Sequence, residues 1–424
     1  MNRTASACVN QGMTRRRATA LASLTLFAAA CGQSAPDRIH RGGPVLTVLS
    51  GTARHVALTP SLSPRALANT QRAFGADLLK AVCSAQKTGN VTVSPASAAL
   101  ALGQLDAGAR GATRAKLDVL LHLPGWSDTV LAAYQAQRVE LARLTQLRVS
   151  NHVYSAQGNP PTQETLDDLA TGFGSKLAQL DFSTPAATDA INADVSTDTK
   201  GLIPKLFDTP LSPSTVTVLT NALHLKADWV TPFDTTTDSP FVTDAGKTVT
   251  APMMSSPELA GAYRSTGGWE SAELPYAGGQ LTAYAILPPK RSRCSEVTGT
   301  DLTALTTGPS LGTTGLQMPS VDLAQTHDLD EPLKALGLPM NGDFSGLGPQ
   351  TDSVSTMIQK VVLKVDKKGT EGAAATGTVM SGSAMMPPHR ELVLDRPYLL
   401  VIQDTKTGTP LFLSRVGDPT GPPT

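Results

Sequence analysis

Five residues, Gly308-Pro309-Ser310-Leu311-Gly312, match the Gly-x-Ser-x-Gly pattern of a nucleophilic serine. In that motif a strand precedes the serine and a helix follows it, so that a strained turn exposes the hydroxyl for attack on an ester or peptide. Asp322 and His327 follow in the chain, but an aspartate and a histidine are too common to complete the case for a triad. The next residues, Thr313 to Pro319, cannot begin a helix of useful length, and a proline between two glycines is typical of a surface turn. A hydrolase that uses Ser310 is therefore a remote expectation.

Metal and cofactor chemistry are not indicated, and we expect no metal site and no cofactor. The seven histidines show no metal-ligand spacing; they are His40, His55, His122, His152, His224, His327 and His389.

The overall composition restricts the class of partner. The chain has 424 residues, of which 40% are hydrophobic, enough for one large or two ordinary domains with a core. Lys plus Arg and Asp plus Glu number 35 each, so the formal net charge is zero. This balance implies no polyanionic partner, and nucleic acid is not expected.

Residues 1–31 have the pattern of an export signal. Arg15-Arg16-Arg17 supplies positive charge, and the apolar stretch from Ala18 to Ala30 is too short to span a bilayer. It ends in Ala28-Ala29-Ala30-Cys31, which resembles a bacterial lipobox with Cys31 as the acylated residue. Ala28 replaces the usual leucine, so ordinary cleavage and a twin-arginine signal stay open. We expect an exported protein, either secreted or held by a lipid anchor in the periplasm or at the cell surface.

Removal of the signal leaves Cys83 and Cys294, at no motif spacing. In an oxidising compartment the two could form a disulfide, and two isolated buried thiols are an equal alternative.

Helical patterns come first along the chain and strand patterns later, which predicts an α+β architecture without internal repeats. Residues 32–65 show no periodicity and are expected to be a flexible tether, and 419–424 are expected to be a tail. Helices are predicted at Ala66–Val82, Ser97–Leu121, Ala132–Leu147 and Thr162–Leu177. Strands are predicted at Thr215–Leu225, Lys247–Met254, Leu281–Leu287 and Gly315–Val321.

A long loop of small residues, Lys367–Met386, lies between two strand-like runs, Val361–Asp366 and Glu391–Ile402. In an extended conformation alternate residues share a face. One such face is small and uncharged, and it consists of Thr370, Gly372, Ala374, Thr376 and Thr378. This face could enter a sheet without overpacking the core or burying a charge. On composition alone a flexible Gly/Ala linker is favoured, so other features must decide.

The segment Gly369–Thr376 resembles the hinge of a serpin reactive-centre loop. Further similarities follow in serpin order at Asn90–Ser97, Gly108–Thr113, Thr220–Trp229, Pro232-Phe233, Glu273–Tyr276, Leu287-Pro288, Met318-Pro319, Asp343–Gly346, Arg396–Tyr398 and Leu411–Val416. Each match is weak alone, but their common order identifies the chain as a member of the serpin family. The resemblance implies a serpin domain at 66–418, with N-terminal helices, a large central mixed sheet, further sheets and an exposed loop at about 367–390.

The resemblance implies suicide inhibition of a serine protease by a monomer. The protease attacks the loop as a substrate and forms an acyl-enzyme, which makes the protease a covalent partner. The cut segment then inserts into the central sheet and distorts the tethered protease before water can complete the reaction. Energy for this step comes from a kinetically trapped native state. The implied hinge residues are Gly369, Thr370, Glu371, Gly372, Ala373, Ala374, Ala375 and Thr376.

The position of the scissile bond stays open. Counting forward from Gly369 by the usual serpin spacing gives Ser383-Ala384, whereas counting back from Pro397 gives Met385-Met386. The candidate residues Ser383, Ala384 and Met385 are small or apolar. Elastase-, chymotrypsin- or subtilisin-like proteases are therefore expected as targets, rather than trypsin-like ones.

Four residues occupy what the resemblance implies is the shutter of the central sheet: Ser94, Ser97, Asn221 and Gln359. Gln359 replaces the usual histidine and could still form hydrogen bonds. For the other three, a helix-cap or a core hydrogen-bond role is equally supported.

One further alternative remains open. Gly372 and Gly377 stand where inhibitory serpins usually have a residue with a Cβ atom, and each glycine adds entropy that insertion must remove. A non-inhibitory serpin that acts as a binding or chaperone-like module is therefore the main rival to an inhibitor.

Overall fold

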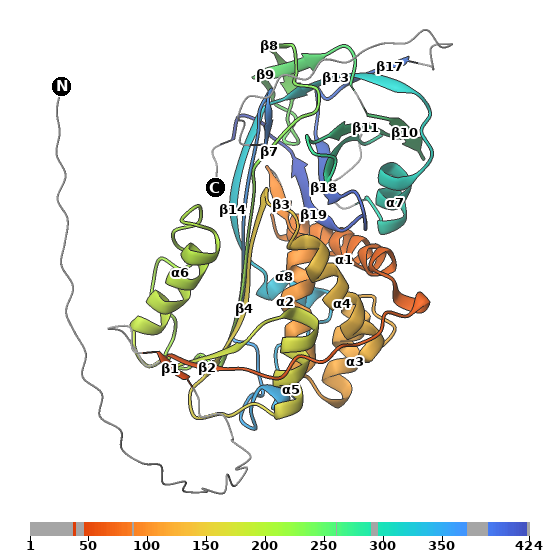
Figure 1. Ribbon diagram of the computed structural model, residues 1–424. Coiled ribbons are helices and arrows are strands. Elements are labelled where there is room, and N and C mark those ends of the chain that lie inside the picture. The colour runs from red at the N-terminus through yellow and green to blue at the C-terminus, as the bar shows by residue number, and fades with distance from the viewer. Residues whose placement is uncertain are drawn as a thin grey trace, which may run out of the picture. The chain divides into compact units, whose positions relative to one another are not determined.

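The computed structural model describes residues 37–39, 46–86, 89–259, 261–289, 296–370 and 389–421. It confirms the predicted α+β architecture, with a long mixed sheet at the centre (Figure 1). In strand order this sheet contains β1 (Asp37–Ile39), β2 (Leu46–Leu49), β5 (Leu177–Leu180), β4 (Leu147–Ala156), β6 (Thr217–Leu225), β15 (Thr356–Val365), β16 (Gly369–Thr370) and β7 (Ala227–Asp228), and β14 (Val321–Asp328) also pairs with β15.

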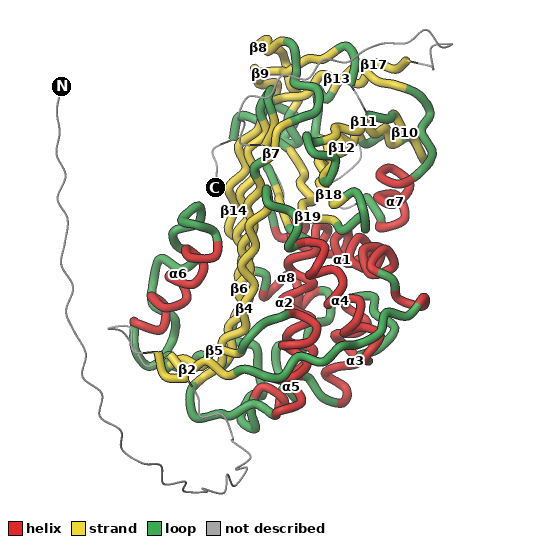
Figure 2. Tube along the Cα trace, in the orientation of Figure 1, coloured by secondary structure: helices red, strands yellow, loops and turns green. Residues whose placement is uncertain are grey.

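Of the two further sheets, the first lies beside the upper part of the central sheet and the second lies at its end (Figure 2). The first, in strand order, contains β10 (Tyr263–Thr266), β11 (Trp269–Pro275), β12 (Leu281–Leu287), β18 (Tyr398–Asp404), β19 (Pro410–Val416) and β3 (Val91–Val93). The second contains β17 (His389–Val393), β13 (Thr313–Pro319), β9 (Thr248–Ser256) and β8 (Thr235–Val242). The predicted strands at Thr215–Leu225, Lys247–Met254, Leu281–Leu287 and Gly315–Val321 are confirmed to within a few residues.

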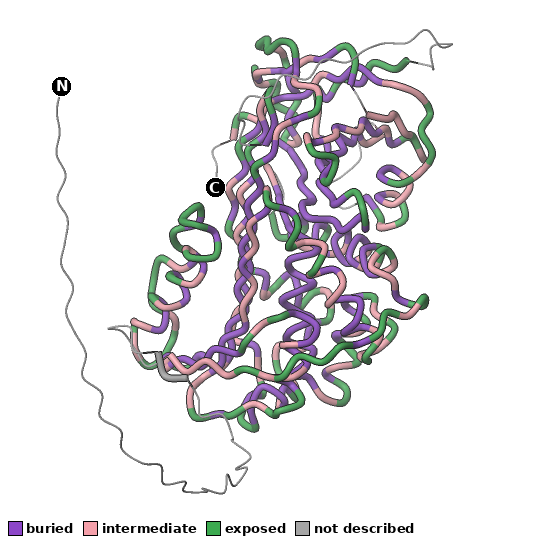
Figure 3. The backbone as a smooth tube through the Cα atoms, in the orientation of Figure 1, coloured by how far each residue is buried: buried purple, intermediate pink, exposed green. Residues whose placement is uncertain are grey.

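Helices cover both faces of the central sheet. Among the described residues, one face carries α6 (Ala186–Asp198) alone, and the other carries a larger group, whose α2 is buried along its whole length (Figure 3). The helices other than α6 are α1 (Pro64–Ala85), α2 (Pro95–Gly108), α3 (Gly111–Leu120), α4 (Asp128–Leu141), α5 (Gln163–Asp168) with its π-helical continuation η2 (Leu169–Phe173), α7 (Gly299–Thr307) and α8 (Asp330–Ala335). None of the helices in the described residues is both long and apolar enough to cross a membrane.

Three helix predictions were too long. The predicted helix Ala132–Leu147 corresponds to α4, which ends at Leu141, and Leu147 already begins β4. In the other two, a glycine lies where the helix is interrupted or ends. The predicted helix Ser97–Leu121 is two helices, which the chain separates at Ala109-Arg110 before Gly111, whose φ is +52°. The predicted helix Thr162–Leu177 ends at Gly174, which adopts a left-handed conformation with φ of 62°. The chain then becomes strand β5, so Leu177 belongs to the central sheet.

The predicted tether at 32–65 is wrong for its second half. β2 pairs antiparallel with β5 and extends the central sheet. The chain then passes so close to α5 that a Cβ atom on Gly51 would lie 2.1 Å from the carbonyl group of Leu166. The apolar run Leu46-Thr47-Val48-Leu49 was the sequence signal for this strand.

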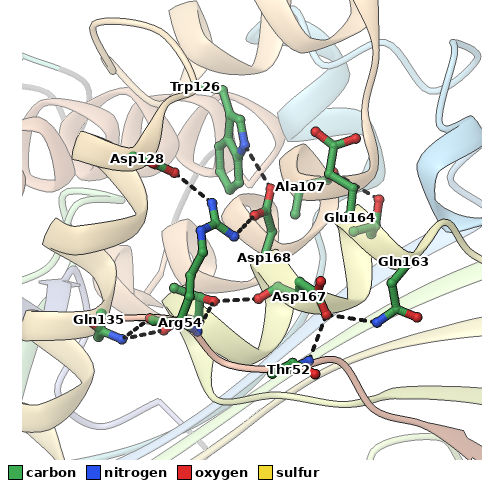
Figure 4. A network of polar contacts seen from close by, with 12 residues as sticks. Thr52, Arg54, Ala107, Trp126, Asp128, Gln135, Gln163, Glu164, Asp167 and Asp168 are labelled. Atoms are coloured by element: carbon green, nitrogen blue, oxygen red, sulfur yellow. Dashed lines mark hydrogen bonds and ion pairs between the residues drawn. The ribbon is translucent and has the colours of Figure 1, made fainter. Parts of the chain in front are cut away.

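Polar contacts fix the segment that follows β2 (Figure 4). The backbone N–H of Thr52 donates to Asp167 at 2.7 Å. The guanidinium of Arg54 forms ion pairs with Asp168 at 2.9 Å and Asp128 at 2.6 Å. The Asp168 side chain is only 6% exposed, so Arg54 neutralises a nearly buried carboxylate on α5.

Replacement of Arg54 by alanine is expected to lower the free energy of unfolding by about 1–2 kcal/mol, because Asp168 would lose its cation at a nearly buried position. Asp128→Ala is the matched control, since the Asp128 side chain is 68% exposed, and we expect it to cost less than about 0.5 kcal/mol. Urea unfolding of both variants measures the difference. Equal costs would show that the segment is held by β2 rather than by Arg54.

The pair of cysteines is only partly described. Cys83 is buried on α1 and is disulfide-bonded. Cys294 lies outside the described residues, as do the predicted export signal and Cys31.

Candidate functional site

The predicted hinge begins inside the central sheet. β15 turns at Asp366–Lys368 and returns as β16. The Asp366 carboxylate accepts hydrogen bonds from the backbone N–H groups of Lys368 at 2.8 Å and Gly369 at 3.2 Å, which closes the turn. The side chains of Lys367 and Lys368 are exposed, so the two lysines do not place charge in the sheet.

The turn is fixed to the chain that follows β7. Backbone N–H groups of Trp229 and Phe233 donate to the carbonyl oxygens of Lys368 and Lys367, at 2.9 and 2.8 Å. The indole N–H of Trp229 also donates to the Asp366 carbonyl at 3.0 Å. Three N–H groups of Trp229 and Phe233 therefore fix the turn Asp366–Lys368, from which the loop begins.

The first two hinge residues, Gly369 and Thr370, are buried. A Cβ atom on Gly369 would lie 2.2 Å from the carbonyl oxygen of Ala227, so only glycine allows this strand to approach β7. The Thr370 hydroxyl is 2.7 Å from the Tyr276 hydroxyl, and Tyr276 stacks on Trp229 at 4.3 Å between ring centroids. Burial raises the pKa of Tyr276, so the phenol stays protonated and can donate. Sequence reasoning missed Tyr276 as a partner of the hinge.

β16 is antiparallel to both of its neighbours, β15 and β7. Below it, β15 pairs directly with β6 in parallel, from Thr356 opposite Val218 to Val362 opposite His224. A strand that continued β16 downward would have to enter between β6 and β15. We call this junction, β6 Val218–His224 against β15 Thr356–Val362, the slot.

The four predicted shutter residues lie together at the slot. The Gln359 amide donates to Asn221 Oδ1 at 3.0 Å, directly across the junction of β15 and β6. The same amide donates to the Ser94 carbonyl at 3.1 Å, and its oxygen accepts from the Ser94 N–H at 2.9 Å. Gln359 thus makes the hydrogen bonds that join both strands to the start of α2.

The two serines also have the helix-cap and core roles that the sequence left open. Ser94 Oγ accepts from the Ser97 N–H at 3.3 Å and caps α2. Ser97 Oγ donates to Asn151 Oδ1 of β4 at 2.7 Å. Asn151 was missed, because β4 has no alternating pattern in the sequence.

The predicted loop beyond Thr370 lies mostly outside the described residues. The hinge residues Glu371, Gly372, Ala373, Ala374, Ala375 and Thr376 and the scissile candidates Ser383, Ala384 and Met385 lie outside the described residues. The chain is described again from His389, where β17 pairs in parallel with β13. The loop therefore begins in the central sheet and ends in a different sheet.

Ser310 does not lie in a nucleophile elbow. Helix α7 precedes it and strand β13 follows it, which is the reverse of the order that the motif requires. The exposed Ser310 hydroxyl forms its hydrogen bonds within its own turn, with the carbonyl and N–H of Gly312. His327 contacts the carbonyl of Thr92 instead, at 2.9 Å. Within the described residues, no group of three His, Cys, Asp or Glu side chains could hold a metal ion.

Comparison with known proteins agrees with this geometry. Residues 69–419 match the family model Serpin (serine protease inhibitor). Iripin-8 of Ixodes ricinus is 30% identical over 82% of this chain and 93% of its own, and leukocyte elastase inhibitor of Bos taurus is 30% identical over 83% and 98%. The crystal structure of mouse protein-Z dependent protease inhibitor aligns with a TM-score of 0.71, at 24% identity, over 84% of this chain and 98% of that one.

Proposed function

This chain belongs to the serpin family of serine protease inhibitors, and from that premise we propose that it acts as a suicide substrate whose cut loop enters the slot. The observation that carries the proposal is β16: two hinge residues already form an antiparallel strand between β15 and β7. Insertion would then be the continuation of a pairing that exists before cleavage.

The register of β16 specifies where each later hinge residue would go. Thr370 lies opposite Val365 on β15 and Ala227 on β7. Six residues further, the same register would place Thr376 opposite Gln359 on β15 and Asn221 on β6. The side chains on the Thr370 face would then meet the buried core, and all of them are small and uncharged.

Insertion at that point must break the hydrogen bond between Gln359 and Asn221, because the two residues would be separated by a strand. The Thr376 hydroxyl could donate to one amide and accept from the other. We infer that Gln359 and Asn221 hold the slot closed and that Thr376 replaces their contact after insertion. The lost and regained hydrogen bonds make this exchange nearly balanced at the shutter.

The target is proposed to be an elastase-, chymotrypsin- or subtilisin-like serine protease. This rests on the small and apolar candidates Ser383, Ala384 and Met385, since pocket complementarity decides specificity. The named relatives include a leukocyte elastase inhibitor, which supports the same class. Export, acylation of Cys31 and a monomeric state are further proposals that rest on the sequence alone. Catalysis of its own is not proposed for this chain.

Incubation of the protein with pancreatic elastase and with subtilisin, followed by denaturing electrophoresis, tests the function. We expect an SDS-stable adduct of protease and inhibitor, because insertion traps the acyl-enzyme. Clean nicking without an adduct by every such protease would instead support the binding or chaperone-like module. Hydrolysis of an ester that Ser310→Ala abolishes would support the remote hydrolase. Mass analysis of the released C-terminal fragment identifies the scissile bond.

A further inference from the structure

Strand β4 has a long edge that no strand covers. β5 pairs with β4 only at Tyr154–Ala156. In the part of the chain that the structure describes, no strand pairs with Leu147–Val153 on the side away from β6. An uncovered edge is a ready template for another strand.

The backbone groups of this edge can be assigned from their neighbours. Ala156 donates its N–H to the residue just before β6, whereas Gln157 donates to the last residue of β5. Backbone groups alternate in direction along a strand, so odd-numbered residues of β4 direct theirs away from β6. Val149 and Asn151 therefore present both N–H and C=O to the uncovered edge.

A cavity of about 1430 Å³ runs along the same edge. This exceeds the volume of roughly 300–1,000 Å³ that is usual for a small-molecule site. Its walls come from α4, η2, β2, β5 and α6, and apolar side chains are prominent among them, including Leu46, Val48, Leu100, Leu141, Leu144 and Phe173. An extended segment that paired with all of Leu147–Val153 would be roughly 23 Å long.

One wall of the cavity carries positive charge without acidic partners. Arg138, Arg148 and Lys176 line it, and none forms an ion pair within the described residues. The guanidinium of Arg138 packs against Gly174, where a Cβ atom would lie 2.9 Å from Cζ. Arg138 Nε is buried, and no hydrogen-bond partner for it lies among the described residues.

The carboxylates of the lining lie on the opposite wall, α6, and comprise Asp189, Asp194 and Asp198. Two of them are engaged by β4: Tyr154 donates to Asp194 at 3.2 Å, and His152 lies 2.6 Å from Asp198. They therefore do not neutralise Arg138 across the cavity. The wall formed by α4, β4 and η2 is left complementary to an anion.

We propose that the open edge of β4, Leu147–Val153, with its cavity is a docking site for an extended, apolar and acidic peptide segment of a partner protein. The segment adds a strand to β4 through Val149 and Asn151, and its carboxylate reaches Arg138. A fatty acid would fill the apolar space but would leave the backbone groups of the edge without partners. The site is distinct from the slot, because β4 and β6 lie between them.

Fluorescence anisotropy tests the site with the intact full chain and a labelled seven-residue peptide of valine and threonine with one central glutamate. We expect saturable binding that Arg138→Gln weakens about tenfold, as for the loss of a charged hydrogen bond. Arg143→Gln is the control, since Arg143 lies in the turn just after α4, pairs with Glu140 and does not line the cavity. No saturable binding, or equal loss in both variants, would overturn the proposal.

A second pair of measurements separates a strand from other occupants. The same peptide with N-methyl groups at alternate residues keeps its side chains but loses its donors, and it should not bind. Equal binding of the N-methylated peptide, displaced by dodecanoate, would replace the proposal by an acyl-chain site. Hydrogen exchange should show protection over residues 147–153. Protection over β6 at 217–225 instead would place the peptide in the slot and overturn the β4 site.

Discussion

Replacement of Thr370 by arginine is expected to convert this inhibitor into a substrate of its target protease. The Thr370 side chain is fully buried and contacts the Tyr276 hydroxyl. An arginine there would bury a charge without a counter-ion, a cost that expels β16 from the sheet. Without β16 the later hinge residues have no template, so hydrolysis of the acyl-enzyme overtakes insertion. We expect the yield of SDS-stable adduct to fall by about tenfold or more, because each ~1.4 kcal/mol added to the insertion barrier slows insertion tenfold.

Two variants separate charge in the sheet from other effects. Lys368→Arg introduces an arginine two residues earlier, on the exposed turn. This variant should trap the protease as well as the parent protein does. Thr370→Ser keeps a hydroxyl for Tyr276 and should also trap. Adduct at the parent level from Thr370→Arg, with the protein folded by circular dichroism, would rule out insertion along the register of β16.

The sequence predicted the start of the slot well but not its surroundings. β6 and β15 are apolar runs in the chain, and the small residues after Gly369 indicated a strand that could enter a sheet. β4 was missed because its central residues are polar. Ser150 and His152 bond to Asp198 of α6, so these polar side chains find their partner on a helix that follows much later in the chain.

The candidate functional site was also predicted only in part. The four predicted shutter residues could be named from the sequence. Ser94, Ser97 and Asn221 lie in motifs that occur in serpin order, and Gln359 stands in the place of the usual histidine. Tyr276, Trp229 and Asn151 could not, since each acts through a contact with a segment far along the chain. The pairing of β2 and the contacts of Arg54 could not be predicted for the same reason. Local composition indicated a tether in which the four apolar residues Leu46–Leu49 were a short strand signal, and the pairing with β5 shows that they form a strand.

Cleavage of the loop is expected to raise the midpoint of thermal unfolding by about 20 °C or more. The slot now holds one parallel pairing, between β6 and β15. Insertion replaces it by two antiparallel pairings, which are slightly more stable per residue, and buries the Thr370 face. A gain on the order of 15 kcal/mol would shift the midpoint of a domain of about 350 residues by that amount. A metalloprotease such as thermolysin is suited to the cut, because it forms no acyl-enzyme and leaves nicked inhibitor alone.

Differential scanning calorimetry of intact and nicked protein measures the shift, and nicked Thr370→Arg is the decisive control. The loop of this variant is cut in the same place, but the arginine prevents β16 from forming, so the cut segment cannot insert into the slot. The control should therefore unfold near the midpoint of intact protein, which separates insertion from any general effect of nicking. Superimposable curves for intact and nicked parent protein would mean that the slot stays closed, and the chain would then be a binding module rather than an inhibitor that traps its target.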